Sequence, residues 1–363
     1  MQVHEVGRRS DRGMMNPGSG WRGRLPRCHI RGMSVESPSP RLRFRRPVRS
    51  RGSGLAYAAL WLLLAAAVAF ALLQLRGGRQ TEEQRLYAEM RTAFVPDSIE
   101  VLGTLDPMMR ETSGLAVSVE YPGTVWSHND SGDEASVYAL DRTGRVVARF
   151  DLEGVEARDW EAMDRGPCAL NPGVECLYVA DTGDNVRRRD VLEIHLVPEP
   201  DPRSDRTSVV AEGSLRYLYP EGPRDAEGVA VAPDGSVVIV TKGRAGEIRL
   251  FGIEPEAVRR AVADDVPVRL DAGTRLPIEP DWDVGRVVTG AAFRTAGAVL
   301  AVRTLSEIYF FGWPDLEEVA PPCFLGRREP QGEAVAWEPS GALLLSSETN
   351  ARGPGQLLRV FCG

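Results

Sequence analysis

Five stretches of the chain resemble one another, and this internal repetition constrains the fold more than any other feature. Each copy reads as an apolar strand, a turn that contains glycine, and a second, more apolar strand. A third strand usually follows, such as "SVYALD" after the first copy and "EIRLFGI" after the third. The five copies occupy residues 113–130, 159–185, 225–243, 287–304 and 331–349.

The spacing of the copies indicates the architecture. With Ala116, Ala162, Gly228, Gly290 and Ala334 taken as equivalent, the successive steps are 46, 66, 62 and 44 residues. A repeated antiparallel meander of about 40–45 residues is typical of a β-propeller blade. The sequence therefore predicts an all-β propeller of five blades with insertions in the two long steps, or of six if one of those steps holds a degenerate blade. A β-sandwich is the alternative, but it does not require such even repetition.

The two ends of the repeat region are expected to meet. Residues 98–105, "SIEVLGTL", precede the first copy, whereas the last copy is cut short at Gly363. We predict that 98–105 supplies the missing outer strand of the last blade, which closes the ring and removes an exposed edge. One helical pattern interrupts the strands, at residues 255–263.

An apolar segment precedes the repeats. Residues 55–75, "LAYAALWLLLAAAVAFALLQL", carry no charge over 21 residues, enough to cross a hydrocarbon core of about 30 Å as a helix. A cleaved signal peptide is the alternative because "AFA" at 69–71 resembles a cleavage site, but signal-peptide apolar regions are usually shorter, about 7–15 residues. We predict a transmembrane signal-anchor helix that is not cleaved.

The charge on the two sides of this segment sets the expected topology. Residues 1–54 contain 13 arginines against three acidic residues, a net +10, so the net −7 of the whole chain leaves −17 for the remainder. The positive-inside rule places the N-terminus in the cytoplasm and the repeats outside it. A basic arm before an acidic body favours these two environments over nucleic-acid binding. The predicted parts are a disordered Arg-rich tail (1–54, starting at Met1 or Met33), the single membrane span (55–75), a juxtamembrane stalk (76–96) and the extracytoplasmic propeller (97–363).

Four cysteines lie in the predicted external region, where disulfides persist. Cys168 and Cys176 flank the turn-forming loop "ALNPGVE", so they are expected to form a hairpin disulfide. Cys323 and Cys362 then tie the last strand to the body of the domain. A zinc site is the alternative, but the sequence has no CxxC motif and no accompanying histidine pair.

Polar residues recur at the strand ends that the propeller brings to one rim of its channel. Just before the small residue of each first strand stand Leu115, Glu161, Glu227, Thr289 and Glu333. Two residues earlier stand Ser113, Asp159, Asp225, Val287 and Gln331. At the ends of the second strands stand Asp130, Asp181, Lys242, Arg303 and Glu348.

So many converging carboxylates repel one another unless something compensates their charge. A hard cation such as Ca²⁺, which takes six to eight oxygen ligands, is one solution; pairing with Lys242 and Arg303, or with backbone N–H groups, is another. An equally open interpretation is that these acids only form Asx-turns and cap strand ends. The candidate metal ligands are Asp130, Asp159, Glu161, Asp181, Asp184, Asp225, Glu227 and Glu333.

Several short motifs resemble those of a bacterial family of exported propellers of mostly unassigned function. They are "ETSGLAVS", "WSHNDSGD", "RDWEAM", "VADTGDN", "HLVPEP", "RDAEGVAV" and "QGEAVAW". That family is similar in turn to phytase-like propellers with esterase-like activity. The resemblance implies Ca²⁺ in an acidic funnel held by Asp159, Glu161, Asp225, Glu227 and Glu333. It also implies that Lys242 and Arg303 face a phosphate.

The sequence favours a binding function over the common enzyme classes. It has no GxSxG motif and no glycine-rich nucleotide loop between a strand and a helix. We expect a membrane-anchored propeller that binds a ligand or an envelope protein at its acidic rim, with Trp126, Trp160 and Trp337 in its core. The alternatives are a Ca²⁺-dependent phosphate-ester hydrolase, with Lys242 and Arg303 as candidate catalytic residues, and a structural envelope scaffold.

Overall fold

The structure is a computed structural model that describes residues 60–72, 95–130, 132–294, 298–326 and 328–362. Residues 60–72 form a helix inside the predicted 55–75 span, and their side chains are exposed. Among the described residues, no helix combines the length and apolar character needed to cross a membrane. The predictions for the tail (1–54), for the stalk up to residue 94 and for the rest of the span fall outside the described residues.

The repeats fold into five mainly antiparallel sheets, each beginning with an innermost strand. The first sheet contains β2 (Thr112–Val117), β3 (Val125–Asn129), β4 (Ser136–Leu140), β5 (Val146–Leu152) and β9 (Ser208–Val209). The second contains β6 (Trp160–Pro167), β7 (Glu175–Asp181), β8 (Leu192–Pro198), β10 (Gly213–Leu218) and β14 (Val268–Arg269). The third contains β11 (Ala226–Val231), β12 (Val237–Thr241), β13 (Arg249–Ile253) and β15 (Thr274–Arg275).

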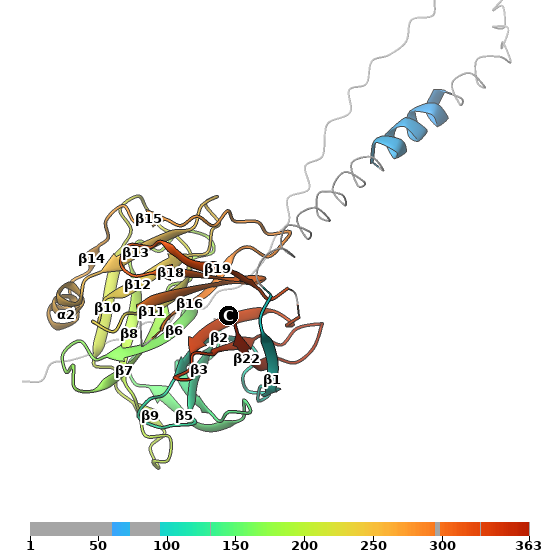
Figure 1. Cartoon of the computed structure of the whole chain (residues 1–363). Helices are drawn as coiled ribbons and strands as arrows, with labels where there is room; N and C mark the ends of the chain where they lie inside the picture. The colour runs from blue at the N-terminus through green and yellow to red at the C-terminus, as the bar shows by residue number, and fades with distance from the viewer. Residues whose placement is uncertain (1–59, 73–94, 131, 295–297, 327, 363) are drawn as a thin grey trace, which may run out of the picture. The chain divides into compact units, whose positions relative to one another are not determined.

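The last two sheets complete the ring. The fourth contains β16 (Val288–Arg294), β17 (Val299–Thr304), β18 (Glu307–Gly312) and β19 (Glu318–Phe324). The fifth contains β20 (Gly332–Trp337), β21 (Leu343–Ser347), β22 (Gln356–Phe361) and β1 (Ser98–Thr104). The innermost strands contact one another in the cyclic order β2, β6, β11, β16, β20 and back to β2. The predicted five-bladed propeller is confirmed (Figure 1).

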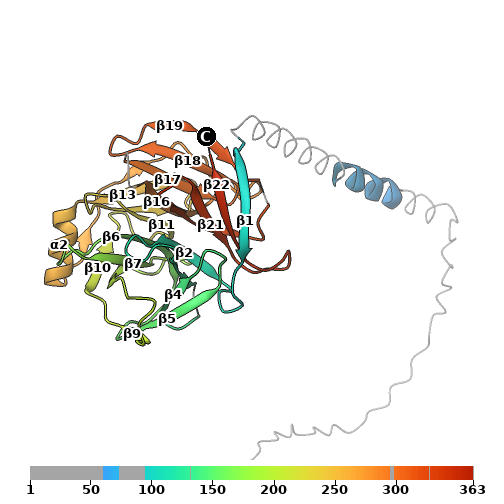
Figure 2. The same ribbon diagram turned by 60° about the horizontal axis from the view of Figure 1, so that its bottom comes forward.

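The ring closes as the sequence predicts. Strand β1 pairs antiparallel with β22, from Ser98 opposite Phe361 to Thr104 opposite Gln356. The cyan β1 and the red β22 accordingly lie side by side although they come from opposite ends of the domain (Figure 2). The last blade thus gains its fourth strand from residues ahead of the first blade, and the β22 edge is covered.

The two long steps contain insertions rather than a sixth blade. The insertion after β8 supplies β9, which pairs in parallel with β5 of the first blade. The insertion after β13 contains α2 (Pro255–Asp264) and β14, which pairs in parallel with β10 of the second blade. Each insertion therefore extends the outer edge of the preceding blade.

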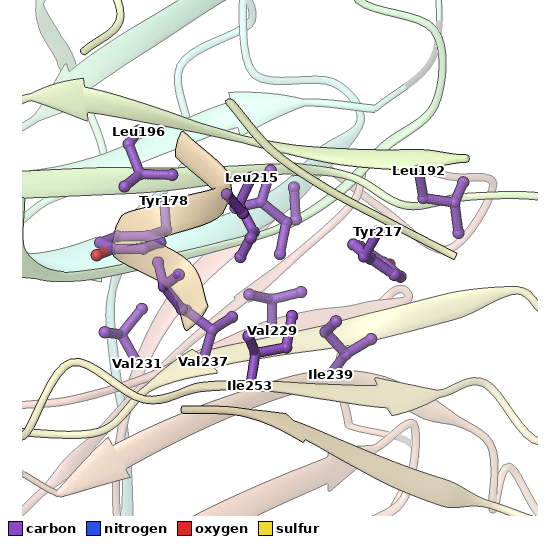
Figure 3. Close-up of a cluster of buried hydrophobic side chains, with 14 of the residues drawn as sticks. Tyr178, Leu192, Leu196, Leu215, Tyr217, Val229, Val231, Val237, Ile239 and Ile253 are labelled. Carbon is purple, nitrogen blue, oxygen red and sulfur yellow. The ribbon is translucent and has the colours of Figure 1, made fainter. Parts of the chain in front are cut away.

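Apolar faces of neighbouring blades pack against each other. Between the second and third blades, Tyr178, Leu196 and Leu215 face Val231 and Val237, and all five are buried (Figure 3). Burial of one such aliphatic side chain contributes about 1.5–3 kcal/mol to stability, so these layers fix the blades around the channel. Of the tryptophans expected in the core, Trp126 and Trp160 are fully buried, whereas Trp337 is only partly buried.

Both predicted disulfides are confirmed. Cys168 and Cys176 join the far ends of β6 and β7, with Cα atoms 4.9 Å apart. Cys323 and Cys362 join β19 of the fourth blade to the end of the fifth, with Cα atoms 5.8 Å apart. Bonded sulfurs cannot bind zinc as thiolates, so the zinc alternative is excluded.

Candidate functional site

A β-bulge near the start of every innermost strand positions the candidate site. In each blade the register with the second strand shifts at this point, so that one or two residues are left out of the pairing. A bulge re-aims the side chain that it leaves unpaired. The residues at the five bulges are Ser113, Glu161, Glu227, Thr289 and Glu333.

In the first blade, the alignment predicted from sequence is wrong by two residues. Gly114, not Ala116, pairs at the position of Ala162 and Gly228, so Ser113 takes the bulge and Leu115 does not. Leu115 is fully buried in the core between the first and fifth blades. The Ser113 hydroxyl donates to the backbone carbonyl of Glu161 at 3.0 Å, so it links two innermost strands.

Five of the predicted metal ligands form two overlapping groups at this end of the channel. Carboxylate oxygens of Asp130, Asp159 and Glu161 lie within 4.8 Å of one another; we call these three residues the Asp130 group. Oxygens of Glu161, Asp225 and Glu227 lie equally close; we call these the Glu227 group. Glu161 belongs to both groups. We call this end of the channel, with its seven carboxylates, the acidic mouth: Asp130, Asp159, Glu161, Asp225, Glu227, Glu333 and Glu348.

The two groups differ in the cations beside them. In the Glu227 group, the Lys242 ammonium forms an ion pair with Glu227, and Arg244 Nε lies 2.7 Å from Asp225 Oδ2. Lys242 is the only lysine in the sequence. In the Asp130 group, neither Asp159 nor Glu161 has an ion-pair partner within 4.0 Å in the part of the chain that the structure describes. Glu227 and Asp225 are therefore compensated by side-chain cations, whereas Asp159 and Glu161 form no ion pair in the described part of the chain.

Burial and repulsion by neighbouring carboxylates raise the pKa values of two members of the Asp130 group, Asp159 and Glu161. Glu161 is 3% exposed, and burial together with Glu227 and Asp130 raises its pKa well above its usual range. Burial, Asp130 and Asp225 raise the pKa of Asp159 to about 6. Both residues are therefore costly to keep charged without a cation.

Three further acids of the mouth, Glu227, Glu333 and Glu348, also have raised pKa values. Burial raises the pKa of Glu227 to about 7, although Lys242 opposes the shift. Burial, Glu348 and Glu227 raise the pKa of Glu333 well above its usual range, and burial, Asp130 and Glu111 raise that of Glu348 to about 7. The Gln331 side-chain amide donates to Glu333 at 2.8 Å and to Glu348 at 2.7 Å, and so joins the two carboxylates of the fifth blade.

The neighbouring carboxylates keep Lys242 positively charged. Burial alone lowers the pKa of an ammonium group, but Glu227 and Glu161 outweigh this effect, and the pKa of Lys242 is raised above its ordinary value. Lys242 is therefore a charged partner of the carboxylates and not a neutral nucleophile.

Arg303 does not join Lys242. Its guanidinium is fully buried between the fourth and fifth blades, where it forms an ion pair with Glu329 and donates to the carbonyls of Ala334 and Ser346. This leaves no exposed guanidinium surface for an incoming anion. The residue that corresponds to Lys242 in the fourth blade is Leu305, because its N–H bonds the carbonyl of Val287 as that of Lys242 bonds Asp225.

Asp181, the last residue of β7, and Asp184 bind groups of the loop that follows this strand. Arg189 NH1 lies 2.5 Å from Asp181. The Asp184 carboxylate accepts the backbone N–H groups of Arg188 at 2.8 Å and of Arg189 at 2.9 Å. These two predicted metal ligands therefore lie outside both carboxylate groups, and Asp184 follows the loop interpretation that the sequence left open.

Of the described residues in the loop after β3, Asp130 belongs to the acidic mouth, whereas Asp133 does not. Asn129 Nδ2 donates to Asp133 at 2.6 Å, and the Tyr138 hydroxyl donates to the same carboxylate at 3.1 Å. These bonds order the loop and direct Asp133 toward β4.

Two further features complete the geometry of the mouth. The Thr289 hydroxyl occupies the bulge between Glu227 and Glu333 in the ring, is 2% exposed, and has no hydrogen-bond partner among the described residues. A side chain on Gly183 would place Cβ 2.3 Å from Asp159 Oδ2 and 2.6 Å from Glu161 Oε1. The absence of a side chain at Gly183 thus lets the loop after β7 pack directly against the carboxylates of Asp159 and Glu161.

Sequence reasoning did not predict that Arg244 pairs with Asp225 or that Arg189, interpreted as part of a solvated or anion-binding charge run, pairs with Asp181. Both follow a second strand in loops whose conformation the repeat pattern does not specify. The available signal was that each arginine comes a few residues after the end of a second strand, within "TKGR" and "DTGDNVRRR".

The strand pairing makes this chain a five-bladed propeller with an acidic channel mouth. No protein-family model matches the sequence, and no curated protein matches it. The resemblance to phytase-like propellers therefore stays a hypothesis.

Solved structures with similar chain paths have low sequence identity. A PQQ-bound aldose sugar dehydrogenase from Streptomyces coelicolor is 14% identical with a TM-score of 0.41, covering 74% of this chain and 99% of that one. A gluconolactonase from Xanthomonas campestris is 15% identical with a TM-score of 0.39, covering 75% and 92%. The calcium-binding protein regucalcin from Agrobacterium tumefaciens is 13% identical with a TM-score of 0.42, covering 74% and 96%. These values transfer no function to this chain.

Proposed function

We propose that this propeller binds a divalent cation, Ca²⁺, in the Asp130 group and uses it to hold a ligand at the acidic mouth. The observation that carries the proposal is the convergence of Asp130, Asp159 and Glu161 within 4.8 Å. Two of these residues, Asp159 and Glu161, have pKa values raised by burial and by neighbouring carboxylates. A bound cation relieves both costs.

The chemistry of the donors favours Ca²⁺ over transition metals. All three side chains of the Asp130 group offer carboxylate oxygen, which hard cations prefer. Neither histidine of the propeller belongs to a carboxylate group: His128 is fully buried against the Asn129 carbonyl, and His195 is bonded to Ser214. Three carboxylates provide fewer than the six to eight oxygens that Ca²⁺ takes, so the remaining positions are available to water and to an oxygen-bearing ligand.

The test is Ca²⁺ titration of the chelator-treated full-length protein by calorimetry, with a thermal melt in parallel. We expect one Ca²⁺ per chain and a higher Tm with Ca²⁺. Asp159→Asn removes the binding, whereas Asp205→Asn, at an exposed position, leaves it intact. Absence of Ca²⁺ binding by the native protein contradicts the proposal.

A second candidate function is hydrolysis of an ester, and one observation favours it. Glu227 and Glu348 have pKa values of about 7 near the Asp130 group, as suits a general base at neutral pH. A Ca²⁺ held by Asp130, Asp159 and Glu161 would supply an activated water. Glu227 or Glu348 would accept its proton as the water oxygen bonds to the ester carbon or phosphorus, and the ester C–O or P–O bond would break to release the alcohol. Lys242 would offset the negative charge that develops on the ester from its position beside Glu227. Arg303 is too buried to assist.

Turnover separates the two candidates. An enzyme hydrolyses a generic phosphate or carboxylic ester with Ca²⁺ and loses this activity in Glu348→Gln, while its Ca²⁺ affinity is largely retained. A binding protein gives no turnover with any divalent cation but still binds Ca²⁺. A structural scaffold, the third alternative, binds neither Ca²⁺ nor an ester.

We further propose that the acidic mouth acts outside the cytoplasm, on a propeller anchored by the apolar segment 55–75. The net +10 of residues 1–54 and the two disulfides of the propeller support this placement. Protease added to intact cells should digest the propeller and leave a tag at the N-terminus protected. Recovery of the full-length protein in the soluble cytoplasmic fraction contradicts this placement.

A further inference from the structure

The end of the channel opposite the acidic mouth contains a second cavity. Its volume is about 160 Å³, and it lies where the innermost strands end, between residues of β2, β6, β11, β16 and β20. A cavity of about 150 Å³ is large enough to bind benzene. We call it the far-end cavity; it is separate from every residue of the acidic mouth.

One buried carboxylate lines this cavity. Asp164 is 8% exposed, and its oxygens accept the backbone N–H groups of Val231 and Arg165, both at 2.8 Å. Burial raises the pKa of Asp164 to about 7, and the N–H groups of Val231 and Arg165, the Arg165 charge and the N–H group of Phe293 offset only part of that shift. The carboxylate is thus fixed by three innermost strands, and it cannot turn away from the cavity without losing these bonds.

The charge of Asp164 is not balanced by the other lining residues. Arg165 is the only cation among them, and it is already committed: NH1 bonds Glu175 at 2.7 Å and Nε bonds the Val117 carbonyl at 2.7 Å. With Arg165 paired to Glu175, the ionisable groups of the lining leave one net negative charge, that of Asp164.

The remaining walls are apolar and aromatic. Phe293 and Trp337 line the cavity together with Pro167, Pro233 and Val231. The Arg294 guanidinium lies 5.5 Å from the Trp337 ring centroid, so this ring already interacts with one cation of the chain. Aromatic faces attract cations, most strongly where water is excluded.

We propose that the far-end cavity binds a small organic ammonium ion, with its charge at Asp164 and its apolar body against Phe293 and Trp337. A bare metal ion does not use apolar walls, and both Asp164 oxygens already accept N–H groups. A neutral apolar molecule leaves the Asp164 charge uncompensated. A monovalent cation with an apolar body of about benzene size satisfies both the charge and the walls.

The experiment compares two probes of nearly the same shape on the full-length protein at pH 8.5, by calorimetry. Benzylammonium carries the charge, and benzyl alcohol does not. We expect benzylammonium to bind with one-to-one stoichiometry and at least about tenfold more tightly than benzyl alcohol, the size of effect expected for one charge-assisted contact. Equal affinities for the two probes, or no binding of benzylammonium, overturn the proposal.

Variants assign the binding to this cavity. Asp164→Asn should bring the two affinities together, and Trp337→Leu should weaken benzylammonium binding by about tenfold through loss of the aromatic face. Asp159→Asn at the acidic mouth is the matched control: it removes Ca²⁺ binding but should leave the benzylammonium affinity unchanged, and loss of benzylammonium binding in this variant places the ammonium at the mouth and overturns the proposal. If Asp164→Asn fails to fold, the native probe pair and Trp337→Leu still decide. Because the proposal does not depend on Ca²⁺, failure of the acidic-mouth function leaves it intact.

Discussion

The two ends of the channel are built from the same strands but treat a buried carboxylate differently. Glu161 and Asp164 both lie on β6, both are buried, and both have raised pKa values. Asp164 accepts the backbone N–H of Val231 on β11 and that of Arg165 on its own strand, so the backbone holds it in place. Glu161 faces Asp130, Asp159, Asp225 and Glu227, so the fold surrounds it with like charge. Backbone donors fix the position of Asp164 but leave its buried charge costly, whereas Glu161 is also opposed by neighbouring carboxylates, which Lys242 offsets only in part, so a bound cation relieves Glu161 the more.

The largest effect should come from the cation that the mouth already contains. Lys242→Met leaves Glu227 and its neighbours buried without their ammonium partner, and breaking a buried ion pair from one side costs about 3–5 kcal/mol. Chemical denaturation in the presence of chelator measures this loss. Lys242→Arg keeps the charge and should retain most of the stability. If Lys242→Met is as stable as the native protein, Lys242 is not the counterion of the mouth.

The next effect separates the two ends of β6. Glu161→Gln removes the residue shared by both carboxylate groups and should lower the Ca²⁺ affinity by about a hundredfold or more, since even partners behind a ligand typically contribute about 10- to 100-fold. Asp164→Asn changes a carboxylate at the other end of the same strand and should leave the Ca²⁺ affinity within about twofold. A similar loss in both variants would show that the two ends are coupled rather than independent.

The pH dependence should distinguish the ends further. Asp159, Glu227 and Glu348 of the mouth have folded-state pKa values above their unfolded values, so the stability that they contribute is present at pH 4 and is lost as pH rises through about 6 to 7. In chelator, Tm should therefore fall by about 5 °C or more between pH 5 and pH 8. Saturating Ca²⁺ should remove most of this fall. The part that remains near pH 7 belongs to Asp164 and should disappear in Asp164→Asn. A Tm in chelator that does not change over this range would contradict the charge strain at the mouth.

The smallest effect concerns the support behind the Asp130 group. Gly183→Ala places Cβ against Asp159 and Glu161, so these carboxylates must move, and Ca²⁺ affinity should fall by about tenfold. Gly173→Ala is the control because its Cβ would meet no atom closer than 3.8 Å. Calorimetric titration of both variants measures the difference. Unchanged affinity in Gly183→Ala would mean that the group is not held in one arrangement.

The fold was predictable because its information is repeated along the chain. Five copies of one strand–turn–strand pattern specify five blades, and the unpaired segment 98–105 supplies the closing strand β1. The disulfide at Cys168 and Cys176 follows from the short turn between two strands, which brings the two positions together.

The candidate site was predictable only where the repeat fixes the register. Glu161, Glu227 and Glu333 all precede the same small residue, so their convergence follows from the pattern. The first blade has Ser113 at its bulge, and "LA" at 115–116 imitates the pattern two residues later, so the alignment shifted there. Arg303 was misplaced for a related reason: it pairs with Gly290 as Val240 pairs with Gly228, and this position points between blades. Bulges and loop conformations decide which residue of a strand faces the mouth, and the repeat pattern alone does not predict them.

The most direct measurement is a crystal structure of the propeller grown with Ca²⁺, with anomalous diffraction from Mn²⁺ in a parallel crystal to locate the ion. Our account predicts one strong peak about 2.3–2.6 Å from carboxylate oxygens of Asp130, Asp159 and Glu161, with Lys242 still on Glu227. A channel mouth without a peak at saturating cation, or a peak held by other residues, would contradict it.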